Sequence, residues 1–595
     1  MQKDNRTYRS LTPAEITQLE RQGNYSADWM SVSVADGFDP DCLWHNIFEG
    51  VVRIGSLTPS KVSHGNITLP EGICNSLLSN TVVGNHPVIH NVRMLSGYTL
   101  GDNCMLVNIS EMSCSAEPQC EWLEPMNENG GRRIMPFPGM TVGEAYLWAR
   151  YRGRKNLMDK LEQFTRDYLA TDEGRLGRVG DACVILHTQV IRNVAILSSS
   201  SDPTTIDTCL SLSDGVIGYG CTLSDGVIAK RFLLGEHVHL EFGLRLNDTV
   251  VGDNSTLARC EVGNSIIFPA HEQHHNNSFL IAALVMGQSN IAAGATIGSN
   301  HNSRTADNEL AAGRGFWPGL CCSFKHSSRF ASYCLLAKGD YPAELDISLP
   351  FALVSNNVAK DRLEIMPAYW WLYNMYAMDR NSRKFAQRDK RLYKAQHIEF
   401  GNLAPDTADE ILRAINQLRA WRAASTGDTV YAQGQEKSRR PTVILKADEA
   451  IDAYQDMLVY YAMKTLGGTP VAPQAPFGAQ PWLNIGGQLV TKSDMEQLIA
   501  DIENGSLGDW KAVRVRFDNL WAQYPALRQK HAYGVLSALS GHGELSPSDW
   551  QHFQQRYAAI QQYVEEQKLA SRRKDETNPF RNMTYWDDDE RAAVL

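Results

Sequence analysis

The sequence lacks the short motifs that identify two large groups of enzymes. No P-loop and no GxSxG nucleophile motif occurs in its 595 residues. The first motif cradles nucleotide phosphates on backbone N–H groups, and the second exposes a serine nucleophile on a sharp turn. The sequence therefore indicates neither a P-loop NTPase nor an α/β-hydrolase.

Long apolar runs are also missing. No uninterrupted apolar stretch reaches the roughly 18 residues that a membrane helix needs. The first residues, MQKDNRTYRSLTPAEITQLERQG, lack the apolar core of a signal peptide and indicate a polar lead followed by a capped helix. We therefore expect no export, no membrane span and a cytoplasmic location.

Paired cysteines and an excess of positive charge are absent as well. The 12 cysteines have no CxxC spacing, which argues against a zinc ribbon or a disulfide framework and favours reduced, mostly buried thiols. A formal net charge of -10 argues against nucleic acid or anionic membrane as a partner. A local basic patch could still bind phosphate.

What the sequence does contain is an apolar repeat of about six residues. A six-residue step rotates an α-helix by about 600° and scatters these positions, whereas six is a multiple of the strand period and keeps them on one side. Glycine, Asn and Asp interrupt the steps and suit tight corners. The repeating residues are Ile217, Leu223, Ile228, Leu234, Leu240, Leu246, Val251, Leu257, Val262 and Phe268.

The steps Ile217-Gly218, Leu234-Gly235, Val251 to Asn254, Val262 to Asn264 and Ile291 to Thr296 resemble the hexapeptide repeat of left-handed parallel β-helix proteins. The resemblance implies that three short strands form a triangular coil of about eighteen residues and that stacked coils bury a continuous core. With its insertion and helical tail, the chain is similar to an uncharacterised bacterial family of large hexapeptide-repeat proteins.

Two parts of the chain depart from the repeat. Residues 111–140 are irregular, and residues 142–169 have helical spacing, which predicts a helix-bearing insertion against the outside of the β-helix. After residue 365, helix signals dominate. We predict a mainly β fold with a lead-in at 1–44, β-helix at 45–110, an insertion at 111–178, β-helix at 179–365 and an α-helical C-terminal domain at 366–595.

Local signals place the helices of the C-terminal domain. Amphipathic stretches cover about 406–422, 447–465, 493–503, 509–537 and 547–571. Ser493 with Glu496 indicates a capping box, and Ser546-Pro547 with Asp549 marks another helix start. Residues 425–442 and 467–481 are interpreted as loops.

Histidines gather where the repeat is interrupted. Seven of the 16 histidines lie between residues 237 and 326, and the loop FPAHEQHHNNSF follows a repeat step. Acyltransferases of the hexapeptide-repeat superfamily use such a histidine as general base. The resemblance implies this role for His271, His274, His275 or His301, with Glu272 or Asn276 orienting the ring. It also implies that the segment containing Asn290, Gly294 and Asn300 lies against the pantetheine arm of a donor.

Two other interpretations of the histidines remain open. The carbonic-anhydrase branch of the superfamily binds zinc through three histidines from adjacent coils, and the spacing of His275, His301 and His326 permits such a site. Presentation of His271 and His275 on one helix face is not expected in this loop. Corner histidines and asparagines also form hydrogen-bonded ladders without chemistry. We do not expect a bound metal.

A basic stripe in the C-terminal domain follows an aromatic run, which consists of Tyr369, Trp370, Trp371, Tyr373 and Tyr376. Arg380, Lys384, Arg388 and Arg391 share one helical face. They could hold the phosphates of CoA, a nucleotide-sugar or a phosphorylated substrate. Alternatively, they form a solvated face or pair with acids of the same protein.

These observations lead to two hypotheses of different classes. The first is transfer of an acyl group from acetyl-CoA or another acyl-CoA to a sugar or nucleotide-sugar hydroxyl or amine, and the resemblance implies a homotrimer. The second is a non-catalytic carbohydrate-binding or scaffold protein. A nucleotidyltransferase domain is not indicated, because Gly130-Gly131-Arg132-Arg133 does not lie between a strand and a helix.

Overall fold

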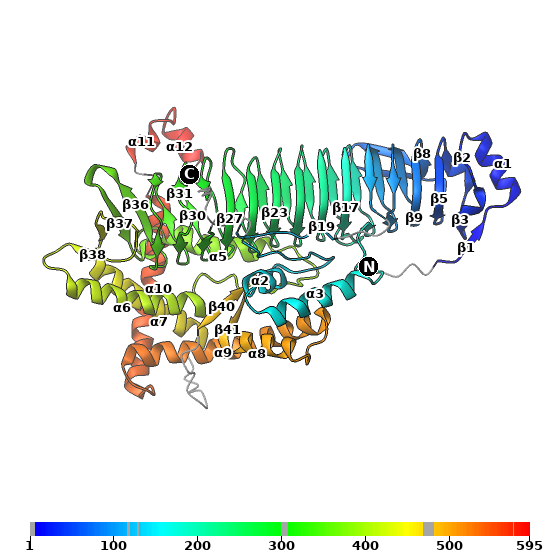
Figure 1. The fold of residues 1–595 in the computed structure, drawn as a ribbon. Helices are drawn as coiled ribbons and strands as arrows, with labels where there is room; N and C mark the ends of the chain where they lie inside the picture. The colour runs from blue at the N-terminus through cyan, green and yellow to red at the C-terminus, as the bar shows by residue number, and fades with distance from the viewer. Residues whose placement is uncertain are drawn as a thin grey trace.

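The computed structural model describes residues 6–115, 120–127, 130–298, 308–467, 481–574, 576 and 578–594. Two parts dominate it: a long stack of parallel strands, and a group of helices that runs beside the stack (Figure 1). The structure confirms a parallel β-helix followed by a helical C-terminal region.

Short strands pair in parallel from coil to coil. Ser211 pairs with Ile228 and Ile228 pairs with Arg245, so each coil takes 17 residues here. One ladder contains β17 (Val190–Ile196), β19 (Ser211–Ile217), β21 (Ile228–Leu234), β23 (Arg245–Val251), β25 (Glu261–Ile267) and β27 (Phe279–Val285). Another contains β16 (Val184–Leu186), β18 (Thr205–Asp207), β20 (Thr222–Ser224), β22 (His239–Glu241), β24 (Thr256–Ala258) and β26 (Glu272–Gln273).

The six-residue pattern describes the buried core with one error. Nine of the ten repeat residues are at most 2% exposed, but Ile228 is 36% exposed. Its neighbour Ala229, at 1%, takes the inward position. Because successive strand residues face opposite sides, choosing the larger side chain shifted the register by one residue at this step.

Glycines in the repeat serve close stacking of coils. A Cβ on Gly218 would lie 2.2 Å from the Gly235 carbonyl oxygen, and one on Gly235 would lie 2.0 Å from Oδ1 of Asp253. Left-handed corners are formed instead by Asp248, Asn254 and Asn264, with φ of 49°, 55° and 39°. The expectation that the glycines of the repeat form left-handed corners is therefore wrong for Gly218, Gly235, Gly252 and Gly263, none of which has a positive φ.

The β-helix begins earlier than the sequence boundary at residue 44. β2 (Tyr25–Ser26) and β3 (Val32–Ala35) already pair in parallel with β5 (Ile47–Ile54). They follow α1 (Pro13–Arg21), which Thr12 and Glu15 cap reciprocally. At the other end, β36 (Leu353–Asn357) pairs in parallel with β33 (Leu335–Leu336) and antiparallel with β37 (Arg362–Met366).

The insertion leaves the β-helix after β14 (Glu111–Ser113) and returns at β15 (Arg178–Val179). Between them, α2 (Val142–Arg150) and α3 (Lys155–Leu169) lie between the β-helix and the C-terminal helices (Figure 1). Residues 142–149 of α2 are all buried. The ring of Tyr146 packs edge-on against Phe268 of the β-helix, at 5.2 Å between centroids. This helix therefore joins the two main parts of the molecule.

The C-terminal region is helical, as predicted, but includes small sheets. Residues 425–442, interpreted as a loop, contain β38 (Val430–Ala432), and β39 (Thr442–Ile444) adds to β37. β40 (Trp482–Ile485) and β41 (Gln488–Thr491) form a hairpin. The helices are α4 (Tyr369–Tyr373), α5 (Met375–Arg388), α6 (Pro405–Ala424), α7 (Ala447–Leu466), α8 (Lys492–Glu503), α9 (Trp510–Ser540), α10 (Pro547–Arg573), α11 (Pro579–Asn582) and α12 (Asp588–Val594).

Helix caps agree with the sequence at one start and differ at another. Ser546 and Asp549 form a capping box at the predicted start of α10. The side chain of Thr491, rather than Ser493, caps α8 and accepts from the backbone N–H of Asp494. None of the described helices is long and apolar enough to cross a membrane.

Candidate functional site

The histidine-rich loop forms a corner of the β-helix, which we call the histidine corner (residues 271–276). Strand β26 lies within it and continues the ladder from β24. His271 is fully buried: its Nδ1 lies 2.8 Å from the Ser289 hydroxyl and its Nε2 lies 3.2 Å from Oε1 of Gln273. Burial lowers the pKa of His271 to about 4. These contacts belong to the hydrogen-bonded ladder of the coil.

Residues 271–275 also spell the pattern H-E-x-x-H, which binds zinc when a helix presents both histidines on one face. Here the middle of the pattern is strand β26. His271 faces the interior, whereas His275 is exposed. The local strand geometry therefore does not present this pattern as a helical zinc site.

Glu272 is the centre of the exposed part of the corner. Its carboxylate lies 3.3 Å from Nδ1 of His274, 2.9 Å from Nζ of Lys384 and 3.2 Å from Nη1 of Arg388. Two groups of candidate residues, far apart in the sequence, thus meet on one carboxylate. The contacts of Lys384 and Arg388 with Glu272 also attach α5 to the β-helix. They match the alternative interpretation, in which the basic residues pair with acids of the same protein.

The local electrostatics keep Glu272 ionised and His274 neutral. Burial raises the pKa of Glu272, but Lys384, His274 and Arg388 outweigh it and the pKa is lowered overall. The pKa of His274 is lowered by burial, against the opposing effect of Glu272. A neutral imidazole beside a carboxylate can accept a proton from a substrate.

The remaining candidates near the corner have mainly backbone contacts. The ring of His275 packs against that of His274 at an interplanar angle of 49°, with centroids 4.5 Å apart. Asn290 donates its backbone N–H to the Phe316 carbonyl, and Gly294 donates to the carbonyl of Asn276. A Cβ on Gly294 would lie 2.9 Å from Sγ of Cys321. Asn300 and His301 lie outside the described residues.

Of the alternative metal set, His275 is exposed, His326 is buried and His301 lies outside the described residues. His326 is 5% exposed and its Nε2 lies 3.2 Å from the carbonyl oxygen of Ile281, inside the stack. Within the described part of the chain, no group of three His, Cys, Asp or Glu is arranged to hold a metal ion.

The basic stripe divides into exposed and buried members. Arg380 is exposed and Arg388 has 60% of its side chain exposed. Arg391 is buried, and its guanidinium contacts Asp253 at 2.6 Å and Asp389 at 2.8 Å. Arg391 is therefore committed to an internal ion pair.

A cavity that the sequence did not indicate lies where the β-helix, the insertion and the C-terminal region meet. We call it the junction cavity; its volume is about 580 Å³. Arg314, 2% exposed, binds both oxygens of Asp406, at 2.9 and 2.8 Å. Glu410 accepts the backbone N–H of Ser332 at 3.0 Å. Burial is the main cause, and repulsion from Asp406 the second, of the rise in the pKa of Glu410 to about 7.

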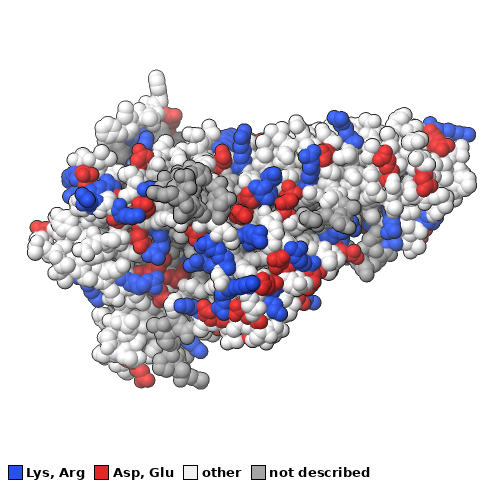
Figure 2. Space-filling model, viewed as in Figure 1, with Lys and Arg blue, Asp and Glu red and all other residues white. Residues whose placement is uncertain are grey.

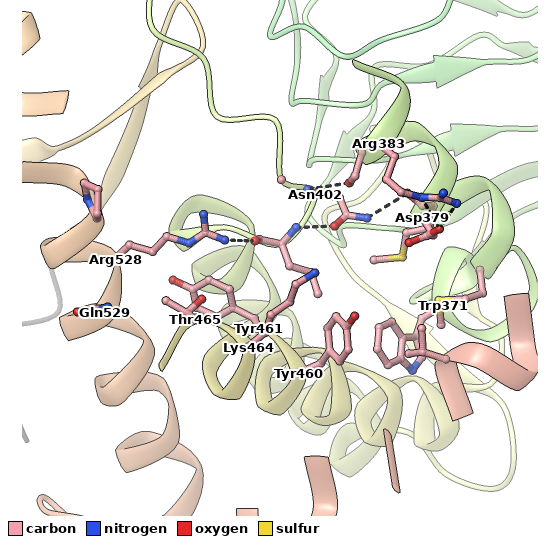
Figure 3. Close-up of a pocket in the computed structure, with 17 residues that line it drawn as sticks. Trp371, Asp379, Arg383, Asn402, Tyr460, Tyr461, Lys464, Thr465, Arg528 and Gln529 are labelled. Atoms are coloured by element: carbon pink, nitrogen blue, oxygen red, sulfur yellow. Dashed lines mark hydrogen bonds and ion pairs between the residues drawn. The ribbon is translucent and has the colours of Figure 1, made fainter. Parts of the chain in front are cut away.

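A second cavity, of about 530 Å³, lies within the C-terminal helices; we call it the aromatic cavity. Figure 3 shows Arg528 on one side of the Asn402 loop and Arg383 with Asp379 on the other. Its wall includes Trp371 and Tyr460, and Nζ of Lys464 lies 5.4 Å from the Tyr460 ring centroid. The aromatic run of the sequence thus contributes both to packing and to a cavity wall.

Surface charge on the visible face is mixed. Lys and Arg lie beside Asp and Glu over the helices of the insertion and the C-terminal region (Figure 2). No broad area of one sign covers this face, which agrees with the many ion pairs between elements.

Comparison with known proteins identifies the family of this chain. Residues 8–422 match the family model described as Domain of unknown function (DUF4954). The chain belongs to this family. The match includes the β-helix, the histidine corner and the residues of α6 that line the junction cavity.

A relative from Treponema pallidum (strain Nichols) bears the name "Uncharacterized protein". It is 40% identical over 655 aligned residues, covering 99% of this chain and 90% of the relative. The similarity thus extends past the end of the DUF4954 match.

Proposed function

We propose that the protein transfers an acyl group from a CoA-type thioester to a hydroxyl or amine of a sugar or nucleotide-sugar, with His274 as general base. The observation that carries the proposal is the 3.3 Å contact between Glu272 and Nδ1 of His274. With Nδ1 donating to the carboxylate, Nε2 bears the lone pair that accepts the acceptor's proton.

Among the histidines of the corner, His274 suits this role best. His271 is enclosed in the coil and is held by Ser289 and Gln273. His275 is exposed, but within the described residues no carboxylate contact orients its ring. The lowered pKa of His274 keeps its imidazole neutral near pH 7, the form that a general base requires.

The surroundings of His274 supply groups for a donor. Arg388 contacts Glu272 beside His274, and Arg380 lies about two turns earlier on α5. Both are exposed and can meet the phosphates of a CoA-type molecule. The six-residue repeat and the parallel β-helix support a place in the hexapeptide-repeat superfamily, in which coil histidines act as bases. The same resemblance makes a homotrimer part of the proposal, and sedimentation velocity measures it.

The first test compares two neighbouring substitutions, His274→Gln and His275→Gln. Turnover is followed by release of the CoA thiol from acetyl-CoA with a panel of sugars and nucleotide-sugars. We expect His274→Gln to lower kcat by about 100-fold or more, because a positioned base contributes about that much. His275→Gln should retain most of the activity.

Binding of the donor is tested separately by the thermal midpoint with acetyl-CoA. Both variants should keep the upward shift of the wild type, and Arg380→Gln should reduce it. Full activity in His274→Gln would rule out this base. An absence of both a shift and thioester loss with every acceptor would contradict acyl transfer from acetyl-CoA.

A second candidate function, non-catalytic carbohydrate binding, is favoured by the aromatic cavity. Tyr460 is partly buried, is supported by the buried Trp371 and offers an apolar face, while Asn402 and Gln529 offer hydrogen-bonding groups. Under this function, Tyr460→Ala should weaken oligosaccharide binding in calorimetry and His274→Gln should leave it unchanged. If His274→Gln weakened oligosaccharide binding and Tyr460→Ala did not, the histidine corner would be favoured as the binding site.

A further inference from the structure

We propose that the junction cavity binds a phosphorylated small molecule that also carries hydroxyl groups. This site is separate from the histidine corner and does not depend on acyl transfer. Its walls come from α2, from the β-helix after β27 and β29 (Leu310–Ala312), from α6, and from the segment β40 to α8.

The charges around the cavity favour an anion. Arg314 and Asp406 neutralise each other, and Glu496 is paired with Arg154 at 2.8 Å. Three exposed cations on the cavity wall have no ion pair within the described part of the chain. Against them stand Glu410 and part of the charge of Glu496, because Arg154 also binds Glu503 at 2.7 Å. These cations are Arg150, Arg413 and Lys492.

Their arrangement suits a phosphate group. Arg150 lies at the end of α2, Arg413 lies on α6, and Lys492 begins α8, so the three cations come from three separate elements. Guanidinium and ammonium groups from different directions can contact different phosphate oxygens. An anion at this position would also reduce repulsion among the cations.

A buried amide forms part of the cavity wall. Asn484 is 8% exposed and lines the cavity. Its Oδ1 accepts the backbone N–H of Gly487 at 2.7 Å, but its Nδ2 has no hydrogen-bond partner among the described residues. Nδ2 is enclosed within the wall and does not face the cavity, so the amide fixes the turn at Gly487 and is not a ligand contact.

Glu410 is suited to recognise a hydroxyl group. One of its oxygens accepts the Ser332 N–H at 3.0 Å, and the Ser332 hydroxyl also interacts with the carboxyl group. A carboxyl group that is half-protonated near pH 7 can donate to a ligand oxygen or accept from a ligand hydroxyl. The charged groups that surround it in the cavity are Asp406, Arg413, Arg314, Arg150, Lys492 and Glu496.

The volume of the cavity sets the size of the ligand. About 580 Å³ falls within the range of roughly 300 to 1,000 Å³ that small-molecule sites occupy. It can contain a sugar phosphate or a mononucleotide. A ligand here would contact three parts of the chain at once and hold the insertion and the C-terminal region against the β-helix.

The test uses sulfate as a probe, because sulfate keeps its two negative charges across the pH range studied. Isothermal titration at constant ionic strength should show saturable binding to the full-length protein. The double variant R413Q/K492Q should bind sulfate about tenfold or more weakly, since each substitution removes a charge-assisted contact. Both residues are exposed, so the fold should be retained.

Matched variants test whether sulfate binds in the junction cavity itself. Arg419→Gln removes an exposed cation from the same helix α6, outside the cavity wall, and should bind sulfate as the wild type does. His274→Gln should also bind normally, so failure of the acyltransferase proposal would leave this result intact.

The pH dependence tests the role of Glu410. Ionisation of Glu410 adds a negative charge to the cavity, so sulfate binding to the wild type should weaken as pH rises through about 7. At pH 8, Glu410→Gln should bind sulfate more tightly than the wild type does. Its sulfate affinity should not fall as the pH rises through about 7. Equal sulfate affinity in R413Q/K492Q and the wild type, or the absence of saturable binding, would overturn the proposal.

Discussion

At the scale of the residue, three histidines within five positions have three different environments. His271 is enclosed in the coil, His274 is held by Glu272, and His275 is exposed. The sequence identified the cluster but could not rank its members, because burial at a β-helix corner depends on which side chains face the neighbouring coils. For the same reason, the six-residue pattern assigned the inward position to Ile228 and not to Ala229.

Stability should depend on pH through His271. Its folded-state pKa of about 4 lies below the ordinary 6.5, so the unfolded chain takes up the proton first as pH falls. The contribution of His271 to the free energy of unfolding is therefore present above pH 6.5. About 3 kcal/mol of it is lost as the pH falls from 6.5 to 4. Thermal midpoints should fall less steeply over this range in His271→Gln than in the wild type.

The variant His275→Gln provides the control for this measurement. His275 is exposed on the same corner, so its replacement should leave the pH profile of the midpoint nearly unchanged. Identical profiles for His271→Gln and the wild type would show that His271 is not buried in the neutral form.

At the scale of the element, strands and helices follow from local patterns. The β-helix is set by a six-residue period, and its coils stack where glycines allow close approach, as at Gly218 and Gly235. The helices α6 to α10 begin and end close to the amphipathic stretches of the sequence. The predicted N-cap of α8 was wrong because two residues near its start have hydroxyl side chains that can cap a helix. Ser493 was predicted, but Thr491 is the N-cap.

The register of β20 and β21 can be tested by a matched pair of substitutions. Leu223 is fully buried, whereas Ile228 is 36% exposed. We expect Leu223→Ala to lower the free energy of unfolding by about 3 kcal/mol and Ile228→Ala by less than about 1 kcal/mol. Denaturant or thermal unfolding gives both values, and a larger loss at Ile228 would show that the register is wrong.

At the scale of the whole molecule, a segment that we call the strap (residues 389–397) attaches the helical region to the β-helix. Glu236 accepts the backbone N–H groups of Tyr393, Lys394 and Ala395 at 3.3, 3.3 and 3.1 Å. Arg391 binds Asp253 beside it. Coil corners of the β-helix thus hold the chain between α5 and α6.

Loss of one partner in this buried pair should be more harmful than loss of both. Arg391→Met leaves Asp253 buried without its cation and should cost about 3 to 5 kcal/mol. The double variant R391M/D253N should recover part of that loss, because it also removes the charge of Asp253. Thermal midpoints and limited proteolysis of the strap measure the effect, and strictly additive losses would contradict a direct pair.

The sequence by itself determined the parallel β-helix, the insertion and the helical C-terminal region. These features depend on periodic burial and helix caps, which act between residues close in the chain. Only the tertiary structure decided which candidates meet: Glu272 with Lys384 and Arg388, and Arg314 with Asp406. The junction cavity draws Arg150, Asn484 and Glu410 from separate segments, so no local pattern marks it. Its chemistry arises from burial and charge that exist only after these segments pack together.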